Sequence, residues 1–224
     1  MSALFVTATG TDIGKTFVTA GLIRALRRAG RQVEALKPVV SGFAMPSAAA
    51  SDPGVLLTAL GRAVTGQELD RISPWRFKAP LSPDMAARLE GGTVDFDRLN
   101  AFCRDRIAAA GDVLLIEGVG GIMTPLDESH TVLNWMIALG LPVLLVAGSY
   151  LGTISHTLSS MDVLAQRGLG VISVVVSESV GATVDLNQTA AAIRRFATPE
   201  VIELPRLPGE TGAHPAFERL AALV

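Results

Sequence analysis

Residues 10–16 read Gly-Thr-Asp-Ile-Gly-Lys-Thr, follow a short apolar run at residues 3–6 and lead into an amphipathic stretch. In such a strand–turn–helix, successive backbone N–H groups can face one anion, and the helix N-terminus adds positive dipole character. Lys15 can reach the outer phosphates of a nucleotide, and the hydroxyl of Thr16 can ligate Mg²⁺. The segment therefore predicts a phosphate-binding loop, against the alternative of an ordinary strand-to-helix turn. Thr9 stands where the strict loop pattern has glycine, so the loop is a variant whose type depends on its surroundings.

Glu117 ends the apolar run at residues 113–116 and precedes the glycine-rich segment 118–121. A carboxylate at the end of an apolar strand can serve a phosphate-binding loop as a Mg²⁺ partner, because this hard cation prefers oxygen ligands. The glycines let the backbone approach a ligand closely. The alternative is that Glu117 caps the next helix.

Lys37 closes another apolar run and is followed by Pro-Val-Val-Ser41-Gly. At the carboxyl end of a strand its ammonium group should face the ligand crevice, where it would neutralise charge moving between two substrates or hold a carboxylate-like group. Ser41 adds a hydroxyl nearby. Asp52, between Ser51 and Pro53, is either a metal ligand or the N-cap of a helix that begins near Pro53.

Residues 148–156 follow a further apolar run and enter a helix, so the free N–H groups around Gly152 and Thr153 predict a site for a second anion, such as a carboxylate tail. His156 is expected to be an ordinary early helix residue. His130 and His214 lack metal-ligand spacing with any partner, and the sequence shows no Ser–His–Asp arrangement.

The elements that must position these residues follow from hydrophobic patterning. Apolar runs of strand length alternate with stretches of helical periodicity, which predicts right-handed βαβ units in an α/β protein. We expect a three-layer fold of the P-loop NTPase type, with a central, mostly parallel sheet flanked by helices. The expected strands are 4–7, 33–38, 113–116, 143–147, 171–176 and 201–204, and the expected helices are 15–29, 96–110, 132–139, 154–167 and 186–196.

Residues 43–83 break this alternation with five prolines and many small or polar residues. They predict loops and short helices that form a lid or substrate rim within a single domain spanning residues 1–224. Residues 215–224 predict a short docking helix.

Composition limits the remaining possibilities. Hydrophobic residues make up 49% of the chain and aromatic residues only 5%, so Val, Leu, Ile and Ala must build the core. The net charge of −2 gives no electrostatic reason to expect nucleic acid or an anionic membrane as partner. The single Cys103 excludes an internal disulfide, and we expect it to be a packing residue in a cytoplasmic protein. The uncharged stretch 129–161 is interrupted by Gly-Leu-Pro at 140–142, which favours helix–turn–strand over a membrane span.

Taken in order along the chain, these segments resemble the dethiobiotin synthetases. The strings that carry the resemblance are FVTATGTDIGKT, ALKPVVSG, the Ser-Asp at 51–52, FKAPLSP, LLIEGVGG, LPVLLVAGSYLG and LPRLPG. The resemblance implies a homodimer that uses ATP, Mg²⁺ and CO2 to close a ureido ring on 7,8-diaminononanoate. A carbamate and a carbamoyl-phosphate mixed anhydride would precede dethiobiotin, ADP and phosphate.

The resemblance also implies a role for each matching residue. Lys15 and Lys37 would be catalytic, Thr16, Asp52 and Glu117 would share Mg²⁺, and Ser41, Gly152 and Thr153 would contact the substrate. The nucleotide would contact these metal ligands as well as Asp12, Ile13, Gly14, Lys15, Phe17, Gly118, Val119, Gly120, Glu178, Ser179, Pro205, Arg206 and Leu207.

This chain departs from the family pattern in two places. The family has Asn-Asp after the fifth core strand, and Glu178 falls on the asparagine position that reads adenine. Because a carboxylate only accepts hydrogen bonds whereas an amide also donates, the preference among ATP, CTP and GTP stays open. Tyr150 and Ser155 stand where the family has lysine and asparagine, so contacts to the substrate tail are expected to differ.

Two other classes share the expected fold. The ATPases of partitioning and septum placement carry a lysine early in the loop, where this chain has Gly10. Synthetases of the cobyrinate type carry a second amidotransferase domain, for which a chain of 224 residues has no room. The ring-closing synthetase is therefore the favoured hypothesis.

Overall fold

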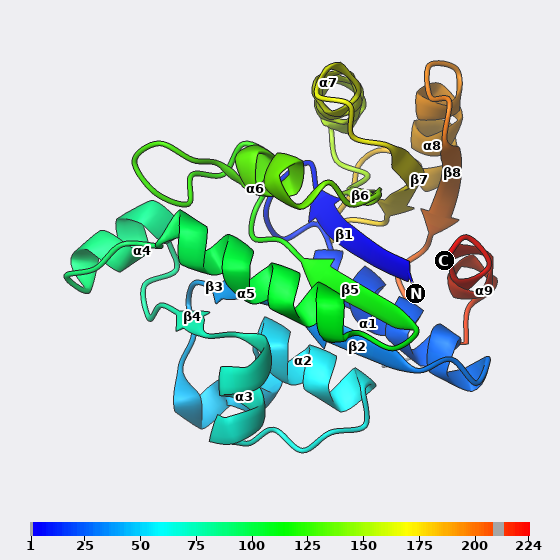
Figure 1. The fold of residues 1–224 in the computed structure, drawn as a ribbon. Coiled ribbons are helices and arrows are strands. Elements are labelled where there is room, and N and C mark those ends of the chain that lie inside the picture. Colours follow the sequence, from blue (N-terminus) through cyan, green and yellow to red (C-terminus); the bar gives the residue numbers. More distant parts are fainter. Residues whose placement is uncertain (1, 208–212) are drawn as a thin grey trace.

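The computed structural model describes residues 2–207 and 213–224, and at its centre lies a six-stranded sheet in the order β2-β5-β1-β6-β7-β8 (Figure 1). Every neighbouring pair of strands in it runs parallel. Its strands are buried Val, Leu and Ile runs, as expected for a sheet covered by helices on both faces. They span β1 (Ser2–Ala8), β2 (Val33–Leu36), β5 (Val113–Glu117), β6 (Val143–Ala147), β7 (Val171–Ser177) and β8 (Glu200–Leu204).

Helices pack on both faces of this sheet (Figure 1). On one face α1 contacts α2 and α9, and on the other α5 contacts α6 while α7 contacts α8. The right-handed sense of parallel crossovers accounts for this division, because the chain moves from β1 to β2 in one direction and from β5 through β8 in the other. These helices span α1 (Lys15–Arg28), α2 (Asp52–Ala59), α5 (Phe96–Ala109), α6 (Val132–Leu139), α7 (Thr153–Gln166), α8 (Leu186–Arg194) and α9 (Pro215–Ala221).

The reversal of winding beside β1 decides where a ligand can bind. Loops that leave neighbouring strands there diverge and open a crevice beyond the carboxyl ends of the strands. The loops after β1, β2, β5, β6 and β7 all leave this edge of the sheet, and these five strands are neighbours. Every segment singled out in the sequence as a candidate for chemistry except Asp52 follows one of them or β8.

The proline-rich region is more regular than the sequence indicates. Besides α2 it contains a 3-10 helix, a second short helix and a two-residue strand. This strand pairs in parallel with another two-residue strand that lies just before the region, and a further helix begins at Pro83. Strands this short carry no readable alternation, so their pairing could not be predicted. Buried leucines of α2 and the next helix join the hydrophobic core, so the region packs onto the rest of the protein. The elements in and beside the region are β3 (Val39–Val40), η1 (Met45–Ala50), α3 (Gly66–Ile72), β4 (Trp75–Arg76) and α4 (Pro83–Leu89).

The C-terminal segment forms a short helix, α9, as predicted, and the structure shows that it packs on α1. Phe217 is fully buried. A Cβ added to Gly21 of α1 would lie only 2.1 Å from a carbon atom of the Phe217 ring. Gly21 therefore lets the two helices approach closely. Within the described residues no helix is long and apolar enough to cross a membrane, and the uncharged stretch 129–161 forms α6, a turn at Gly140, β6 and part of α7.

Candidate active site

The loop between β1 and α1 has the conformation that a phosphate cradle needs. Gly14 lies in the left-handed region at φ 89°, and Asp12 is held at φ 58°. A Cβ on Gly14 would lie 2.8 Å from the Ser177 Oγ at the end of β7, so a larger residue would collide there as well as strain the backbone. Lys15 then begins α1, whose first N–H groups face the loop.

Lys37, just after β2, is the centre of a buried polar cluster. Its Nζ donates to Glu117 Oε1 at 2.7 Å and to the Gly118 carbonyl oxygen at 2.8 Å, and it lies 2.8 Å from Asp52 Oδ2. Thr16 Oγ1 donates to the same Glu117 oxygen at 2.6 Å. Residues from four different segments thus meet at one ammonium group that is 1% exposed.

Electrostatics favour the charged forms of Lys37 and Asp52. Burial by itself would lower the pKa of Lys37, but the charges of Glu117 and Asp52 outweigh it, and the pKa is raised above its ordinary value. Burial would likewise raise the pKa of Asp52, yet the nearby Lys37 charge holds it below the usual range. Lys37 therefore keeps its positive charge, and Glu117 and Asp52 balance this charge before a ligand binds.

Lys15 has a different electrostatic environment. Its Nζ donates to the Gly120 carbonyl oxygen at 3.1 Å. Burial and the neighbouring Lys37 charge lower the pKa of Lys15 to about 8. Neighbouring carboxylates balance the charge of Lys15 less fully than that of Lys37. An anion that binds beside Lys15 would therefore stabilise its protonated form.

A hollow of about 760 Å³ lies above these groups. It brings together most of the predicted phosphate, metal and substrate residues. Ser41 lines it with a hydroxyl oxygen that is buried and has no hydrogen-bond partner among the described residues. Thr124 and Pro125, which the sequence did not single out, also line it, together with residues 80–83. The predicted residues on its wall are Asp12, Gly14, Lys15, Thr16, Phe17, Lys37, Ser41, Asp52, Val119 and Gly120.

A second hollow of about 210 Å³ adjoins the first. It shares Asp12, Gly14 and Phe17 with the larger hollow, so the two meet at the loop after β1. Its wall holds six further predicted nucleotide residues from three separate segments of the chain: Ile13, Glu178, Ser179, Pro205, Arg206 and Leu207.

The residues present fit a magnesium ion. Thr16 Oγ1 and Glu117 Oε1 are in hydrogen-bond contact, and Lys37 bridges Glu117 to Asp52. Glu117 Oε2 is buried without a hydrogen-bond partner in the part of the chain described. An unpartnered carboxylate oxygen beside a hydroxyl and a second carboxylate is the hard donor set that Mg²⁺ prefers.

Two alternatives from the sequence are wrong. Ser51, not Asp52, is the N-cap of α2, since the Ser51 hydroxyl accepts from the Gly54 N–H and the helix begins at Asp52. Glu117 is bound to Thr16 and Lys37 and does not cap a helix.

Four predicted residues do not line either hollow, and one of them, Glu117, lies buried beneath the larger hollow in contact with Lys37. Gly118 contributes its carbonyl oxygen to Lys37. Gly152 is the left-handed N-cap of α7, and Thr153 is buried, with its hydroxyl donating to the Gly148 carbonyl oxygen at 2.9 Å. The predicted substrate contacts of Gly152 and Thr153 therefore stay predictions. His156 is an early residue of α7, as expected, and its Nδ1 lies 2.9 Å from the Tyr150 hydroxyl.

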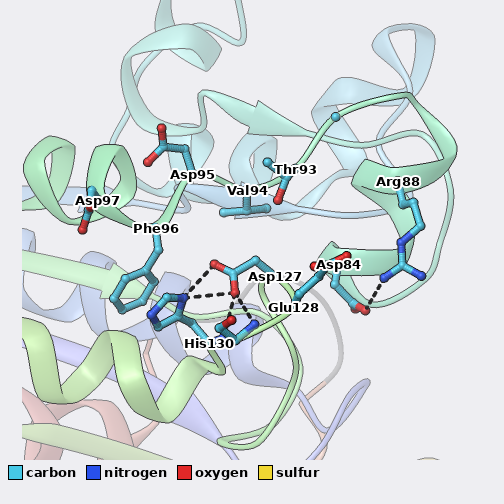
Figure 2. A pocket seen from close by; sticks show the side chains of 12 residues that line it. Asp84, Arg88, Thr93, Val94, Asp95, Phe96, Asp97, Asp127, Glu128 and His130 are labelled. Atoms are coloured by element: carbon cyan, nitrogen blue, oxygen red, sulfur yellow. Dashed lines mark hydrogen bonds and ion pairs between the residues drawn. The ribbon is translucent and has the colours of Figure 1, made fainter.

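An acidic hollow of about 600 Å³ lies between the start of α5, the end of α4 and the 127–130 loop (Figure 2). Three of its five carboxylates have structural partners. Asp127 lies against the His130 ring, and Asp84 pairs with Arg88. Asp95 caps α5. None of the predicted site residues lines it, so it is a part of the structure separate from the two hollows at the loop after β1.

Comparison with known proteins identifies relatives over most of the chain. Residues 2–212 match the family described as AAA domain. The chain is 46% identical over 211 residues to "ATP-dependent dethiobiotin synthetase BioD" of Acidiphilium cryptum, covering 93% of this chain and 95% of the relative. It is 50% identical over 197 residues to the protein of the same name from Caulobacter vibrioides, covering 88% of each. The Methylobacterium nodulans protein of that name is 49% identical, covering 92% of this chain and 94% of the relative.

Solved structures confirm the P-loop NTPase fold. The septum site-determining protein MinD from Pyrococcus horikoshii, complexed with Mg-ADP, aligns with a TM-score of 0.58 at 16% identity, over 98% of this chain and 94% of that chain. A ParA family ATPase from Chlorobium tepidum aligns with a TM-score of 0.54 at 11% identity, over 99% and 91%. At such identities the likeness extends to the fold alone.

Proposed function

The chain belongs to the family of ATP-dependent dethiobiotin synthetases, and we propose that it closes a ureido ring on 7,8-diaminononanoate in the hollow around Lys37. The overall reaction joins the diamine and CO2 with ATP, giving dethiobiotin, ADP and phosphate. The observation that carries this proposal is the buried Lys37 ammonium, held between Glu117 and Asp52 beside a phosphate-binding loop.

The chemistry makes three demands on the site. One amine of the substrate adds to CO2 and loses a proton, which gives a carbamate. A carbamate oxygen then attacks the outer phosphorus of ATP, and ADP leaves. Finally the second amine attacks the carbonyl carbon of the mixed anhydride and expels phosphate, which forms the second C–N bond and closes the ring. Two anions must therefore meet in line, and catalysis depends mainly on positioning and charge neutralisation.

The residues around the larger hollow match these demands. Lys15 lies at the start of α1, where it would neutralise the outer phosphates. Lys37 lies between Glu117 and Asp52 and would hold the carbamate. Thr16, Asp52 and Glu117 would bind Mg²⁺, which supplies positive charge to the phosphates. The unpartnered Ser41 hydroxyl would donate to the substrate.

A direct assay tests this function. Purified protein with 7,8-diaminononanoate, bicarbonate, Mg²⁺ and ATP should yield dethiobiotin and ADP in equal amounts, measured by mass spectrometry and a coupled ADP assay. Omission of the diamine should abolish ADP release. Steady ATP hydrolysis without dethiobiotin would reject the proposal and favour the nucleotide-switch class.

We further propose that the protein acts as a homodimer in the cytoplasm. Support comes from the family resemblance and from exposed apolar side chains, of which Leu151 is 85% exposed and Leu89 71%. Exposed apolar side chains of this size are stabilised when a second copy of the chain covers them. Sedimentation equilibrium at micromolar concentration should give twice the chain mass, and a single-chain mass would reject the dimer.

A further inference from the structure

The segment that follows β5 packs directly against the phosphate-binding loop. A Cβ added to Gly121 would lie 3.2 Å from the Thr9 carbonyl oxygen and 3.3 Å from the Gly10 backbone, so only glycine allows the two backbones to approach this closely. Across this contact the Nζ of Lys15 donates to the Gly120 carbonyl oxygen. The peptide group between Gly120 and Gly121 therefore decides where the ammonium group of Lys15 is held.

Thr124 holds the other end of that same peptide group. Its Oγ1 accepts from the Gly121 N–H at 2.9 Å, and its own backbone N–H donates to the Gly121 carbonyl oxygen at 3.1 Å. In a trans peptide the N–H and the C=O point in opposite directions. One continuous chain of hydrogen bonds thus runs from the Lys15 ammonium through the Gly120 carbonyl and the Gly121 N–H to the Thr124 hydroxyl, and bonds in such a chain strengthen one another.

The fit of the Thr124 hydroxyl depends on the glycine beside it. Gly120 has φ 60°, and a Cβ there would lie 2.3 Å from Thr124 Oγ1. The hydroxyl therefore occupies space that any larger residue at position 120 would fill.

Thr124 itself is anchored by α6. Its carbonyl oxygen accepts from the Val132 N–H at 3.0 Å, and the Ile122 carbonyl oxygen accepts from the Leu133 N–H at 2.7 Å. Val132 is fully buried, so the start of α6 is a firm support for the turn. Thr124 also lines the larger hollow, which places this hydrogen-bond chain beside the groups that would bind the phosphates.

We propose, on the basis of the proposed function, that Thr124 is a positioning residue for the step in which a carbamate oxygen attacks the outer phosphorus of ATP and ADP leaves. Its hydroxyl fixes the Gly120–Gly121 peptide, and this peptide directs the ammonium group of Lys15 at the phosphate that is transferred. An ammonium group has three N–H donors, so the bond to Gly120 orients the other two toward phosphate oxygens. A donor that is oriented beforehand stabilises the developing charge without reorganisation.

Replacement of Thr124 by valine keeps the shape of the side chain and removes the acceptor. The Kd of the Mg²⁺ complex of AMP-PNP, an ATP analogue that is not hydrolysed, should rise by about 10-fold in T124V, as for the loss of one hydrogen bond in a charged network. T124A, which removes the acceptor without adding bulk, should show the same loss, and T124S should recover the affinity because it keeps the hydroxyl. T189V is the matched control, since the Thr189 hydroxyl donates to the Asp185 carbonyl oxygen in α8 and lines neither hollow.

A double-mutant cycle with K15A tests whether Thr124 acts through Lys15. If it does, adding T124V to K15A should change the Kd of AMP-PNP by less than about twofold, although the same change costs about 10-fold in the wild-type background. In turnover, T124V should lower kcat and leave the KM of the diamine within about twofold of wild type. An equal loss of affinity in both backgrounds, an unchanged Kd in T124V and T124A, or a failure of T124S to recover would overturn the proposal.

These binding measurements also separate this inference from the proposed function, because they require no turnover. A preparation that forms no dethiobiotin but shows the loss in T124V, the recovery in T124S and the cycle with K15A would reject the ring-closing function and support the positioning of Lys15 by Thr124. Absence of AMP-PNP binding by the wild type would overturn both.

Discussion

Lys37 illustrates how one residue can serve both stability and chemistry. Its ammonium group is buried together with Glu117, which is fully buried. A buried ion pair is weak evidence for stability, because the cost of desolvation offsets much of the attraction. Its location among the metal and phosphate groups therefore points to a role in charge neutralisation.

Replacement of Lys37 by methionine should affect turnover and stability separately. We expect kcat to fall by about 10²–10³-fold, as for the loss of one preorganised donor. The free energy of unfolding should fall by about 3–5 kcal/mol, because Glu117 becomes a buried charge without compensation. Steady-state kinetics and urea unfolding measure the two effects.

The double variant K37M/E117Q provides the control for this prediction. It removes both buried charges, so it should recover most of the lost stability and remain inactive. Normal turnover in K37M would remove Lys37 from the chemistry. Recovery of turnover in the double variant would show that Lys37 serves only to balance Glu117.

Asp127, in the acidic hollow, gives a prediction about pH. Its Oδ1 accepts from the Ser129 and His130 N–H groups, each at 2.7 Å. Burial would raise the pKa of Asp127, but these bonds and the His130 ring outweigh it and lower the pKa. A carboxylate with a lowered pKa stabilises the fold above the unfolded-state pKa, and this contribution disappears as pH falls through the folded-state pKa.

The variant D127N should therefore lower the free energy of unfolding by about 1–2 kcal/mol near neutral pH. The difference from wild type should begin to shrink as pH falls toward about 4, the ordinary pKa of an aspartic acid, and should close only below the lowered folded-state pKa. Urea unfolding across this range measures it, with D105N as a control at an exposed acid. If the difference in unfolding free energy between wild type and D127N does not change with pH, the charge of Asp127 is not its cause.

At the scale of elements, strands and helices with strong patterning follow the sequence closely. The predicted helix 132–139 and strand 143–147 match α6 and β6 at both ends. Their apolar pattern and the Gly140 turn agree with the tertiary packing. Elements such as β3 and β4 could not be predicted, since two residues show no periodicity and only their pairing defines them.

The contact of α1 with α9 gives a prediction at this scale. The variant G21A should lower the free energy of unfolding by about 1–3 kcal/mol, because its methyl group would overlap the buried Phe217 ring. Thermal unfolding checks this. G66A is the matched control, since a Cβ there meets nothing within 4 Å and it should unfold at the wild-type temperature. The double variant G21A/F217L should recover stability relative to G21A, and failure to do so would place the strain elsewhere.

At the scale of the whole molecule, Cys103 reports on the packing of one face of the sheet. It is fully buried in α5, and burial raises the pKa of its thiol to about 12. Because the thiolate is the reactive form, the native protein should resist a disulfide reagent at pH 8 and react with one equivalent in urea. C103S should not react in either state. Rapid labelling of the native protein would show that this face opens readily.

The sequence by itself determined the local features of this protein. The phosphate-binding loop depends on a short run of neighbouring residues, and the fold class depends on the repeated alternation of apolar strands with amphipathic helices. Both are recorded in periodicity and spacing, so the parallel sheet and its flanking helices were predictable.

Only the tertiary structure decided which distant residues meet. Asp52 could have capped its helix, and its pairing with Lys37 became visible only when the loop after β2 folded over the edge of the sheet. The strand order, the union of two hollows at Asp12, Gly14 and Phe17, and the fixing of Glu178 by Arg206 arose in the same way. Such contacts join residues far apart in the chain, and their energies depend on packing and burial that no local pattern records.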